Sequence, residues 1–491
     1  MSIVSRLIEG VRAIGRTRAA APGGHRVVVR ARYDAAQTNL DNRKHWAMAD
    51  GLSADAAASP TVRRTLRNRA RYEVANNSYA RGIVLTLAND CIGTGPRLQL
   101  MGFSGEDARF IERSFIEWSH TVELAEKLRS MRMAMAEDGE SFALLTSNPV
   151  LPTPVQLDLK VIEADQVATP TSPILPSNAV DGIVFDDFGN PLEYHVLKNH
   201  PGSPITTLRL EADRVPAASM IHLFRPDRPG QRRGIPEITP AIPLFAQLRR
   251  YTLAVIAAAE TAADYAGIVY TDAPAGGEAD QVEPMDTIEL EKRALLTMPG
   301  GWKMEQMRAE QPTTTYAEFK HEILNEIARC LNMPFNIAAG NSSSYNYASG
   351  RLDHQTYYKS IRVDQARLVS QIIDRVFAAW VREAILIEGF LPQRLRSVDT
   401  DWSHQWFWDG HEHVDPAKEA NAQATRLASH TTTLADEYAR KGQDWEIQLN
   451  QRARELTLMR QLGLELKPAD GGPSLQPIPT GSAPDEETGD E

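Results

Sequence analysis

The stretch LNMPFNIAAGNSSSYNYASGR, residues 331–351, lies between the two clearest helical patterns of the chain. A helix ends there at Pro334, about fifteen small, polar and amide residues follow, and a much longer helix begins. Such a polar loop fits two roles: a lid over an active site, or a finger that reaches into a space shared by several chains. The surrounding sequence distinguishes these roles.

Helical sequence precedes and follows this stretch. Residues 313–333 carry Phe319, Ile323 and Ile327 at four-residue spacing, which is typical of one buried helix face. Residues 351–388 contain no proline and predict a helix on the order of 50 Å long, at 1.5 Å per residue. We expect a helix of that length to serve as a structural support.

A third long helix is predicted upstream, over residues 236–267. It is rich in alanine, and Gly267 is placed as its C-terminal stop. Small residues around a long helix allow neighbouring helices to approach closely. Between this helix and the next, residues 268–312 predict short strands around an acidic loop.

Changes of composition divide the rest of the chain. Two helices are predicted over 60–93 and 104–136, and strands are predicted at GESFALLTS, VQLDLKVIEADQV and GIVFDDFGNPLEYHVL, the last of them a hairpin. Residues 60–235 therefore predict a mixed α/β body. We also expect a partly disordered arm at 1–59, helices over 409–468, and a disordered acidic tail at 469–491.

Composition argues against several classes of protein. The chain has 491 residues, more than a single core normally supports, and a formal net charge of −11. This acidic balance argues against a protein that grips nucleic acid through basic patches. Cys91 and Cys330 are the only cysteines, so we expect no disulfide framework. The most apolar window, 253–259, is far shorter than the roughly 20 residues of a membrane span, so we expect no membrane partner.

Catalytic motifs are scarce in this sequence. It contains neither a phosphate-binding P-loop nor a nucleophile elbow, and we expect no cofactor. The best metal candidate is WDGHEHVDP, in which Asp409, His411, His413 and Asp415 lie near His404. The same residues also read as the start of a capped helix, and no third ligand is fixed by spacing. We therefore favour a structural role for them.

Other charged residues also have structural interpretations. Arg63, Arg64, Arg67 and Arg71 repeat along a predicted helix and indicate a solvated or partner-facing stripe. The stretch AEDGES, residues 136–141, places carboxylates around a glycine, which is typical of a solvated turn. A long chain with so few catalytic constellations indicates a mechanical or assembly component.

Four longer stretches support that interpretation. They are LRNRARYEVANNSYARGIVLTLANDCIGTGPRLQL, IHLFRPDRPGQRRGIPEITPAI, EILNEIARCLNMPFNIAAGNSSSYNYASGR and VDPAKEANAQATRLASHTTTLADEYARKGQDWEIQLNQRARE. Each resembles a segment of the portal proteins of tailed bacteriophages, of the lambda-like branch, and all four stand in the order of that family.

The resemblance implies a ring, typically of twelve subunits, at one vertex of a capsid, through which double-stranded DNA enters and leaves. It also implies an α+β fold of portal type. The implied parts are a mixed α/β wing (60–235), a stem of two helices (236–267 and 313–333), a small β-containing clip (268–312), a tunnel loop (334–350), a long helix that returns to the wing (351–408) and a helical crown (409–468).

The resemblance assigns roles to individual residues as well. The channel-lining tunnel loop would contain Asn341, Ser342, Ser343, Ser344, Tyr345, Asn346 and Tyr347. The stem would contain Arg249, Arg250, Glu260 and Asp264, and the clip would present Glu283, Asp286, Glu289 and Glu291 to the packaging terminase. Further implied partners are copies of the same chain, major capsid and scaffold proteins, and head-completion or connector proteins. The implied location is the virion, after assembly in the bacterial cytoplasm.

The chemistry of the loop agrees with this role. Serine and asparagine offer hydrogen bonds without charge, whereas lysines would add strong, salt-sensitive affinity for phosphates. Two alternatives stay open: a metal-dependent hydrolase that uses the 409–415 cluster, and a monomeric adaptor that binds nucleic acid. The resemblance itself implies no enzymatic activity.

Overall fold

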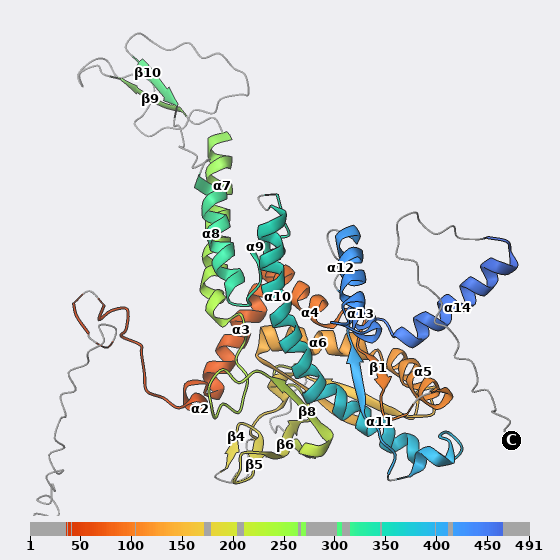
Figure 1. The fold of residues 1–491 in the computed structure, drawn as a ribbon. Coiled ribbons are helices and arrows are strands. Elements are labelled where there is room, and N and C mark those ends of the chain that lie inside the picture. The colour runs from red at the N-terminus through yellow and green to blue at the C-terminus, as the bar shows by residue number, and fades with distance from the viewer. Residues whose placement is uncertain are drawn as a thin grey trace, which may run out of the picture. The chain divides into compact units, whose positions relative to one another are not determined.

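The computed structural model describes residues 36, 38–40, 42–103, 105–170, 178–203, 211–263, 267–271, 302–306, 315–343, 346–397, 399–410 and 416–464. The chain divides into two compact units, Met1–Ser53 and Ala54–Glu491. In the first unit, the side-chain oxygens of Asn39 and Asn42 each accept a hydrogen bond of 2.9 Å from the other's backbone N–H. The second unit contains the helices and strands labelled in Figure 1.

Helices form the first part of the second unit. They are α2 (Ala54–Ala57), α3 (Pro60–Asn76), α4 (Ser78–Ile92), α5 (Glu106–Thr121) and α6 (Leu124–Asp138). The two long helices predicted here are each divided in two. Asn77 has an extended backbone, and its side-chain oxygen accepts hydrogen bonds from the N–H groups of Tyr79 and Ala80, so it caps α4. Glu123, with a left-handed φ of +53°, separates α5 from α6.

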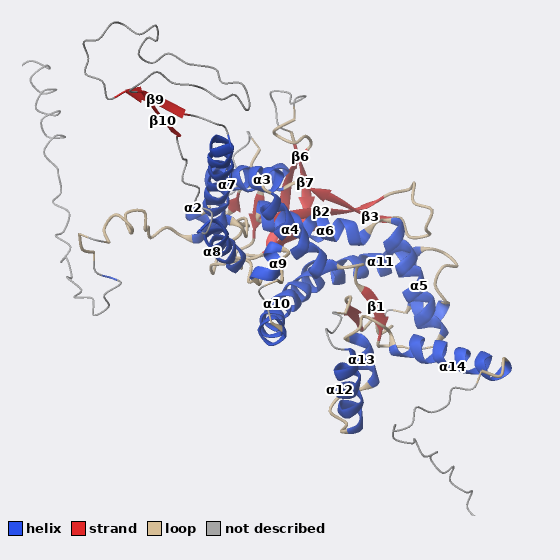
Figure 2. Cartoon of the chain, turned by 90° about the horizontal axis from the view of Figure 1, so that it is seen from above, coloured by secondary structure: helices blue, strands red, loops and turns tan. Residues whose placement is uncertain are grey.

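Two antiparallel sheets follow α6 in the chain. The first has the order β3-β2-β8 and consists of β2 (Glu140–Ser147), β3 (Leu157–Ile162) and β8 (Met220–Phe224). The second has the order β4-β5-β6-β7 and consists of β4 (Ala179–Val180), β5 (Ile183–Phe185), β6 (Pro191–Leu197) and β7 (Ala212–Pro216). Two 3-10 turns lie beside these strands, η2 (Ala164–Gln166) and η3 (Ala217–Ser219). Helix α6 packs on β2, as Figure 2 shows.

The predicted hairpin is confirmed. Strands β5 and β6 pair across a turn in which the Asp186 carboxylate accepts hydrogen bonds from the N–H groups of Phe188 and Asn190. The mixed α/β character predicted for this part of the chain is confirmed with it.

A further small sheet joins segments that lie far apart in the chain. Strand β1 (Arg97–Leu100) pairs with β11 (His404–Phe407), with Arg97 opposite Phe407. This pairing places the aromatic residues around Trp406 next to β1, which follows α4 in the chain.

The alanine-rich helix α7 (Ile242–Ala263) follows the turn η4 (Thr239–Ala241) and pairs with α8 (Thr315–Arg329). Between them in the chain, β9 (Gly267–Thr271) and β10 (Trp302–Gln306) form an antiparallel pair. The short strands expected after the alanine-rich helix are therefore present. None of the helices in the described part of the chain has the length and apolarity that a membrane crossing requires.

A continuous helical rod follows the short helix α9 (Phe335–Ala339). It consists of α10 (Tyr347–Leu368), a π-helical segment (Val369–Ile373) and α11 (Asp374–Leu386). The long helix predicted from residue 351 is thus confirmed, but it starts four residues earlier and contains a π segment. The remaining elements are the 3-10 turn η6 (Gln393–Arg396) and the helices α12 (Pro416–Ala428), α13 (Leu434–Ala439) and α14 (Trp445–Gln461).

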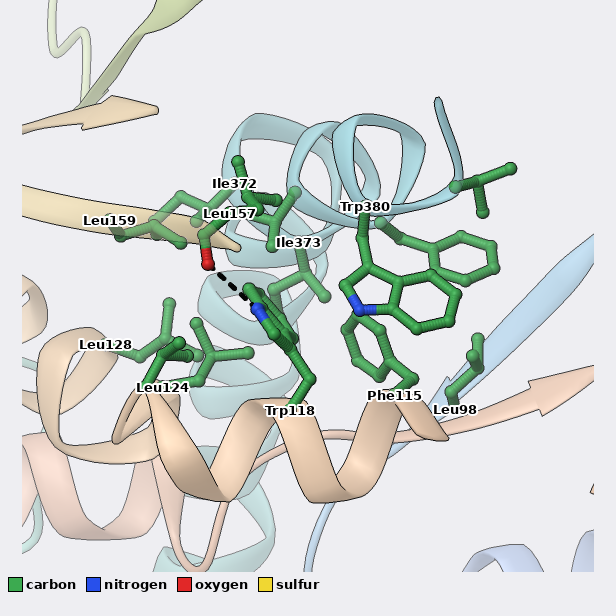
Figure 3. Close-up of a cluster of buried hydrophobic side chains, with 14 of the residues drawn as sticks. Leu98, Phe115, Trp118, Leu124, Leu128, Leu157, Leu159, Ile372, Ile373 and Trp380 are labelled. Carbon is green, nitrogen blue, oxygen red and sulfur yellow. Dashed lines mark hydrogen bonds between the residues drawn. The ribbon is translucent and has the colours of Figure 1, made fainter. Parts of the chain in front are cut away.

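Two large hydrophobic clusters hold these elements together. In the first, shown in Figure 3, Trp118 and Phe115 of α5 meet Trp380 of α11, and the Trp118 indole N–H donates a 2.8 Å hydrogen bond to the Leu157 carbonyl. The second cluster joins the base of α7, with Phe245, to α3, α4, α8, α9 and the first half of α10. The rod therefore contributes to both clusters.

Replacing either of two glycines of the second unit with alanine is expected to change the free energy of unfolding, in opposite directions at the two positions. A Cβ on Gly82, inside α4, would meet no atom within 4 Å, so Gly82→Ala is expected to raise the free energy of unfolding by about 0.5–1 kcal/mol. A Cβ on Gly234 would overlap the backbone of Gly139, so Gly234→Ala is expected to lower it by about 1–3 kcal/mol. Urea unfolding of both variants measures the difference, and equal effects would contradict the packing described here.

Candidate functional site

The exposed loop between α9 and α10 is shorter than the sequence predicts. Phe335 and Ala338 of α9 are buried in the second cluster, and Gly340 ends α9 with a left-handed φ of +62°. Asn341 and Ser343 are both exposed beyond it. The first part of the polar stretch therefore belongs to the core, and only the part after Gly340 is presented at the surface.

Hydrogen bonds hold the described loop residues in place. The Asn341 side-chain oxygen accepts a 2.9 Å hydrogen bond from the N–H of Ser343. Buried Asn336 contributes a side-chain amide that lies 3.5 Å from the Ser342 hydroxyl. Asn346 caps α10, since its side-chain oxygen accepts a 2.9 Å hydrogen bond from the N–H of Ser349. The exposed residues from Asn341 to Ser343 present amide and hydroxyl groups and no charge.

The helix that begins at this loop is anchored to α4. Tyr357 is fully buried, and its hydroxyl donates a 2.9 Å hydrogen bond to the Asp90 carboxylate. Burial raises the pKa of Tyr357, so the hydroxyl stays protonated and can donate. Two turns further on, the Gln365 amide donates a 3.1 Å hydrogen bond to the Cys91 carbonyl. Movement of α10 along its axis would break both bonds.

The helix pair α7 and α8 is joined by aromatic contacts. The ring of Tyr251 lies 4.6 Å from that of Phe319 and 5.6 Å from that of Tyr316. Beside these rings, Arg250 lines a cavity of about 560 Å³ on the outside of the pair, together with Leu253. The cavity is a surface recess in which Arg250 is exposed.

The other predicted stem residues lie in different surroundings. Arg249 donates a 3.4 Å hydrogen bond to the Tyr72 hydroxyl of α3 and lies over its ring, so it helps to hold α7 on the body. Glu260 is exposed near the end of α7. Several predicted residues lie outside the described residues: Asp264, Glu283, Asp286, Glu289, Glu291, Ser344, Tyr345 and the side chain of Tyr347.

Two structural interpretations from the sequence are wrong. Glu140 of AEDGES is not in a solvated turn: its side chain has no exposed surface. The arginine stripe is solvated only in part: Arg64 is exposed, but Arg63 and Arg67 are buried. Arg63 contacts Asp181, and Arg67 contacts Glu140. Arg233 binds Glu140 through both oxygens, at 2.7 to 3.0 Å, and the N–H of Gly234 adds a 3.0 Å hydrogen bond.

The charge state of this network follows from its contacts. Burial alone would raise the pKa of Glu140, but Arg233 and the hydrogen bond from His222 hold it well below its usual value. Glu140 is therefore a carboxylate throughout the physiological range. The partners of Glu140 come from α3, β8 and the segment before α7, and Arg233 also donates a hydrogen bond to the Asp181 carbonyl between β4 and β5. The network therefore joins the two sheets to the segment that leads into α7.

A second buried network lies at the base of the same helix. Arg132 of α6 contacts Glu237 at 2.7 Å and Asp364 of α10 at 2.7 Å, and Arg225 contacts the other oxygen of Glu237 at 2.8 Å. The side chains of Arg132 and Glu237 are each 2% exposed. The segment that leads into α7 is thus tied to the rod that carries the loop.

Sequence reasoning missed Arg132, Glu237 and Asp364. A signal was nevertheless present, because Glu237 stands between Pro236 and Ile238 in an apolar segment ahead of a helix. A carboxylate in such a setting is buried and needs a partner. The partner could not be identified from spacing, since it comes from α6.

Two of the metal candidates, Asp409 and the nearby His404, lie among the described residues and have other partners. Asp409 accepts hydrogen bonds from Thr94 and lies 3.3 Å from the Arg97 guanidinium. His404 contacts Asp374 at 3.2 Å. His411, His413 and Asp415 lie outside the described residues.

A different group has the spacing of metal ligands. Within the described ranges, Glu163, Asp165 and His200 offer ligand atoms within 4.8 Å of one another. Arg67 and Arg71 already contact Asp165 at 2.8 Å each. Those guanidinium groups supply the positive charge that a metal ion would otherwise bring.

These features define a structural subunit: a long rod and a helix pair, tied together by buried ion networks, with an uncharged loop at the start of the rod. Residues 41–365 match the family model described as phage portal protein, lambda family. The match spans more than half of the chain, which therefore belongs to the lambda family of phage portal proteins. The α+β fold of portal type and the portal role in the phage particle are established with it.

Two relatives in sequence agree with this assignment, and one solved structure is also similar. A probable portal protein of Halomonas phage phiHAP-1 is 28% identical over 457 residues, which cover 87% of this chain and 86% of the relative. Portal protein B of Escherichia phage lambda is 22% identical over 471 residues, which cover 84% and 87%. A solved structure, the neck of an empty GTA particle, is 15% identical, with a TM-score of 0.48, and covers 78% of this chain and 94% of that one.

Proposed function

We propose that this portal protein assembles into a ring of twelve copies around an axial channel, and that the loop from Asn341 to Tyr347 lines the channel as double-stranded DNA passes. The observation that carries the proposal is the uncharged surface of the described loop residues, on a helix anchored by Tyr357 and Gln365. DNA that is driven through a channel needs a loop that is firmly anchored to its subunit and that binds the DNA only weakly.

The chemistry of the loop supports passage rather than binding. Amide and hydroxyl groups form hydrogen bonds with phosphate oxygens, but they release no condensed counterions. A net charge of −11 on each chain, repeated around a ring, repels the DNA backbone from the wall and keeps it near the axis. Both effects lower the friction on DNA.

The remaining parts of the chain take the roles that the family resemblance implies. Helices α7 and α8 form the stem, and the clip presents Glu283, Asp286, Glu289 and Glu291 to the large terminase subunit during packaging. Capsid and scaffold proteins surround the ring, and head-completion proteins bind it after packaging. The role is mechanical, without catalysis, at the portal vertex of a particle assembled in the bacterial cytoplasm.

Electron microscopy of the purified full chain tests the ring directly. Class averages are expected to show closed rings with a central hole, and mass photometry is expected to give about twelve times the chain mass of 54.4 kDa. A monodisperse monomer across the micromolar range would contradict the proposal.

A further inference from the structure

Helix α14 is the most exposed long helix of the second unit. None of its seventeen residues is buried, although it carries several large apolar side chains. Ile447 and Leu458 are each 54% exposed, Leu449 and Leu456 are 38% and 36% exposed, and Leu462, the C-cap residue that follows the helix, is 64% exposed. In the fold as described, this apolar surface faces water.

The apolar residues of α14 lie on two faces. At about 100° per residue, Leu449, Leu456 and Met459 fall on one side of the helix, called face A, with Trp445 and Ala453. Arg452 and Arg460 lie among these residues, so face A is apolar with two long basic side chains. Ile447, Leu458 and Leu462 fall on the roughly opposite side, called face B. A surface helix that packs on its own chain normally has a single apolar stripe.

The N-terminal end of α14 is held firmly. Asp444 caps the helix by accepting hydrogen bonds from the N–H groups of Glu446 and Ile447, at 2.8 and 3.0 Å. The other oxygen of Asp444 accepts a 2.8 Å hydrogen bond from the Gln99 amide of β1. The first turn of α14 is therefore attached to β1, and both faces of the helix are exposed.

We infer that α14 packs between the α14 helices of two neighbouring copies of the chain, with face A of each copy against face B of the next. The inference rests on the proposed ring and assigns it an interface. In a closed ring every subunit uses two different surfaces, one toward each neighbour. A single helix that supplies both surfaces needs two apolar faces on opposite sides, as α14 has. Pairing of two copies through face A alone would leave face B in water.

Charges are complementary along one side of the proposed contact. Arg452 lies within face A, between Trp445 and Met459 around the helix, and Glu455 borders face B on the same side; in the isolated chain they lie 3.3 Å apart. On the other side, Glu446 borders face A and Arg454 borders face B. In parallel helices Arg452 of one copy and Glu455 of the next differ by about 4.5 Å in height and can pair, whereas Glu446 and Arg454 differ by about 12 Å. Opposite charges therefore meet along one edge of the contact.

Cysteine cross-linking of the full chain tests the arrangement. Leu456 of face A and Leu458 of face B lie at nearly the same height, so Leu456→Cys with Leu458→Cys in one chain places a thiol on each side of every junction. Mild oxidation is expected to give a ladder of multimers on a non-reducing gel, extending to the full ring. Each single variant is expected to give no ladder. The pair Leu449→Cys with Ile447→Cys repeats the test nearer the base of the helix.

The controls separate this inference from the proposed ring. Gln448→Cys with Asn450→Cys places two thiols at nearly the same height on the polar sides of α14, so it is expected to remain uncross-linked, as is the native chain with Cys91 and Cys330. Rings in the microscope without a ladder from either apolar pair would overturn the role of α14 and leave the ring intact. Dimers from a single variant would overturn the unlike pairing of faces, and an absence of rings from the native chain would overturn the proposed function itself.

Discussion

Replacing Ser342, Ser343 and Ser344 together with lysine is expected to slow DNA packaging on the order of tenfold or more at low salt, while ring assembly stays intact. The reason is electrostatic. Each copy of the loop gains three cations, and every lysine that binds a phosphate releases counterions and must be detached again as the duplex advances. Packaging rate is measured as DNA protected from nuclease over time, and ring assembly is measured by electron microscopy.

Two further measurements distinguish electrostatic binding of DNA from steric obstruction by the longer side chains. They are the salt dependence of the packaging rate and the effect of an uncharged variant. Raising the salt concentration should restore much of the lost rate in the lysine variant, because log affinity falls linearly with log salt. The matched control replaces the same three serines with glutamine, which resembles lysine in length but carries no charge. Equal slowing by glutamine and lysine would show steric obstruction, and unchanged packaging in the lysine variant would remove the loop from the channel.

Replacing Arg233 with methionine lowers the free energy of unfolding by about 3–5 kcal/mol, the range for breaking a buried ion pair. Arg233 binds both oxygens of Glu140, whose side chain has no exposed surface. The variant leaves that carboxylate with fewer partners in a dry site. Chemical denaturation at neutral pH measures the loss.

The adjacent residue offers a matched control. Arg232 is 36% exposed, and its nearest carboxylate, on Asp55, is 4.0 Å away, so Arg232→Met should lower the stability by about 1 kcal/mol or less. A loss from Arg233→Met no larger than that from Arg232→Met would contradict the importance assigned to the network.

The same network predicts how stability depends on pH. The pKa of Glu140 is lower in the folded state than its unfolded value of about 4.3. Its contribution to stability is therefore fully present above that unfolded pKa and is lost as the pH falls through the folded pKa. Weakening the Glu140 contacts by Arg233→Met should reduce the slope of stability against pH below about pH 4.

Helices and their order were predictable because their signals are local. The proline at the start of α3, the capping residues and the spacing of Phe319, Ile323 and Ile327 act over a few residues. The division at Asn77 was missed because a helical pattern continues on both sides, and only the cap geometry reveals the break. The pairing of β1 with β11 was missed because strand partners so distant in the chain leave no local mark.

The buried networks failed to emerge from the sequence for a related reason. Arginines at helical spacing look the same whether they face water or a buried carboxylate, and the partners of Arg67 lie on β2 and in the turn that follows β3. The uncharged character of the loop could be predicted because it follows directly from the residue types, which are serine, asparagine and tyrosine. The residue at which the exposed loop begins could not be predicted, since the burial of Phe335 depends on the second cluster.

The π segment Val369–Ile373 sets the angle between the two halves of the rod. Up to Ile361 the inward side chains belong to the second cluster, and from Leu368 onward they belong to the first. One extra residue rotates the rest of an α-helix by about 100°, and a π turn absorbs it locally. Deleting one residue in this segment would rotate one half of the rod about the helix axis relative to the other, so that different side chains would face one of the two clusters. Because each cluster holds one half of the rod in a defined rotation about the helix axis, a twist applied to one half must be transmitted to the other half as rotation.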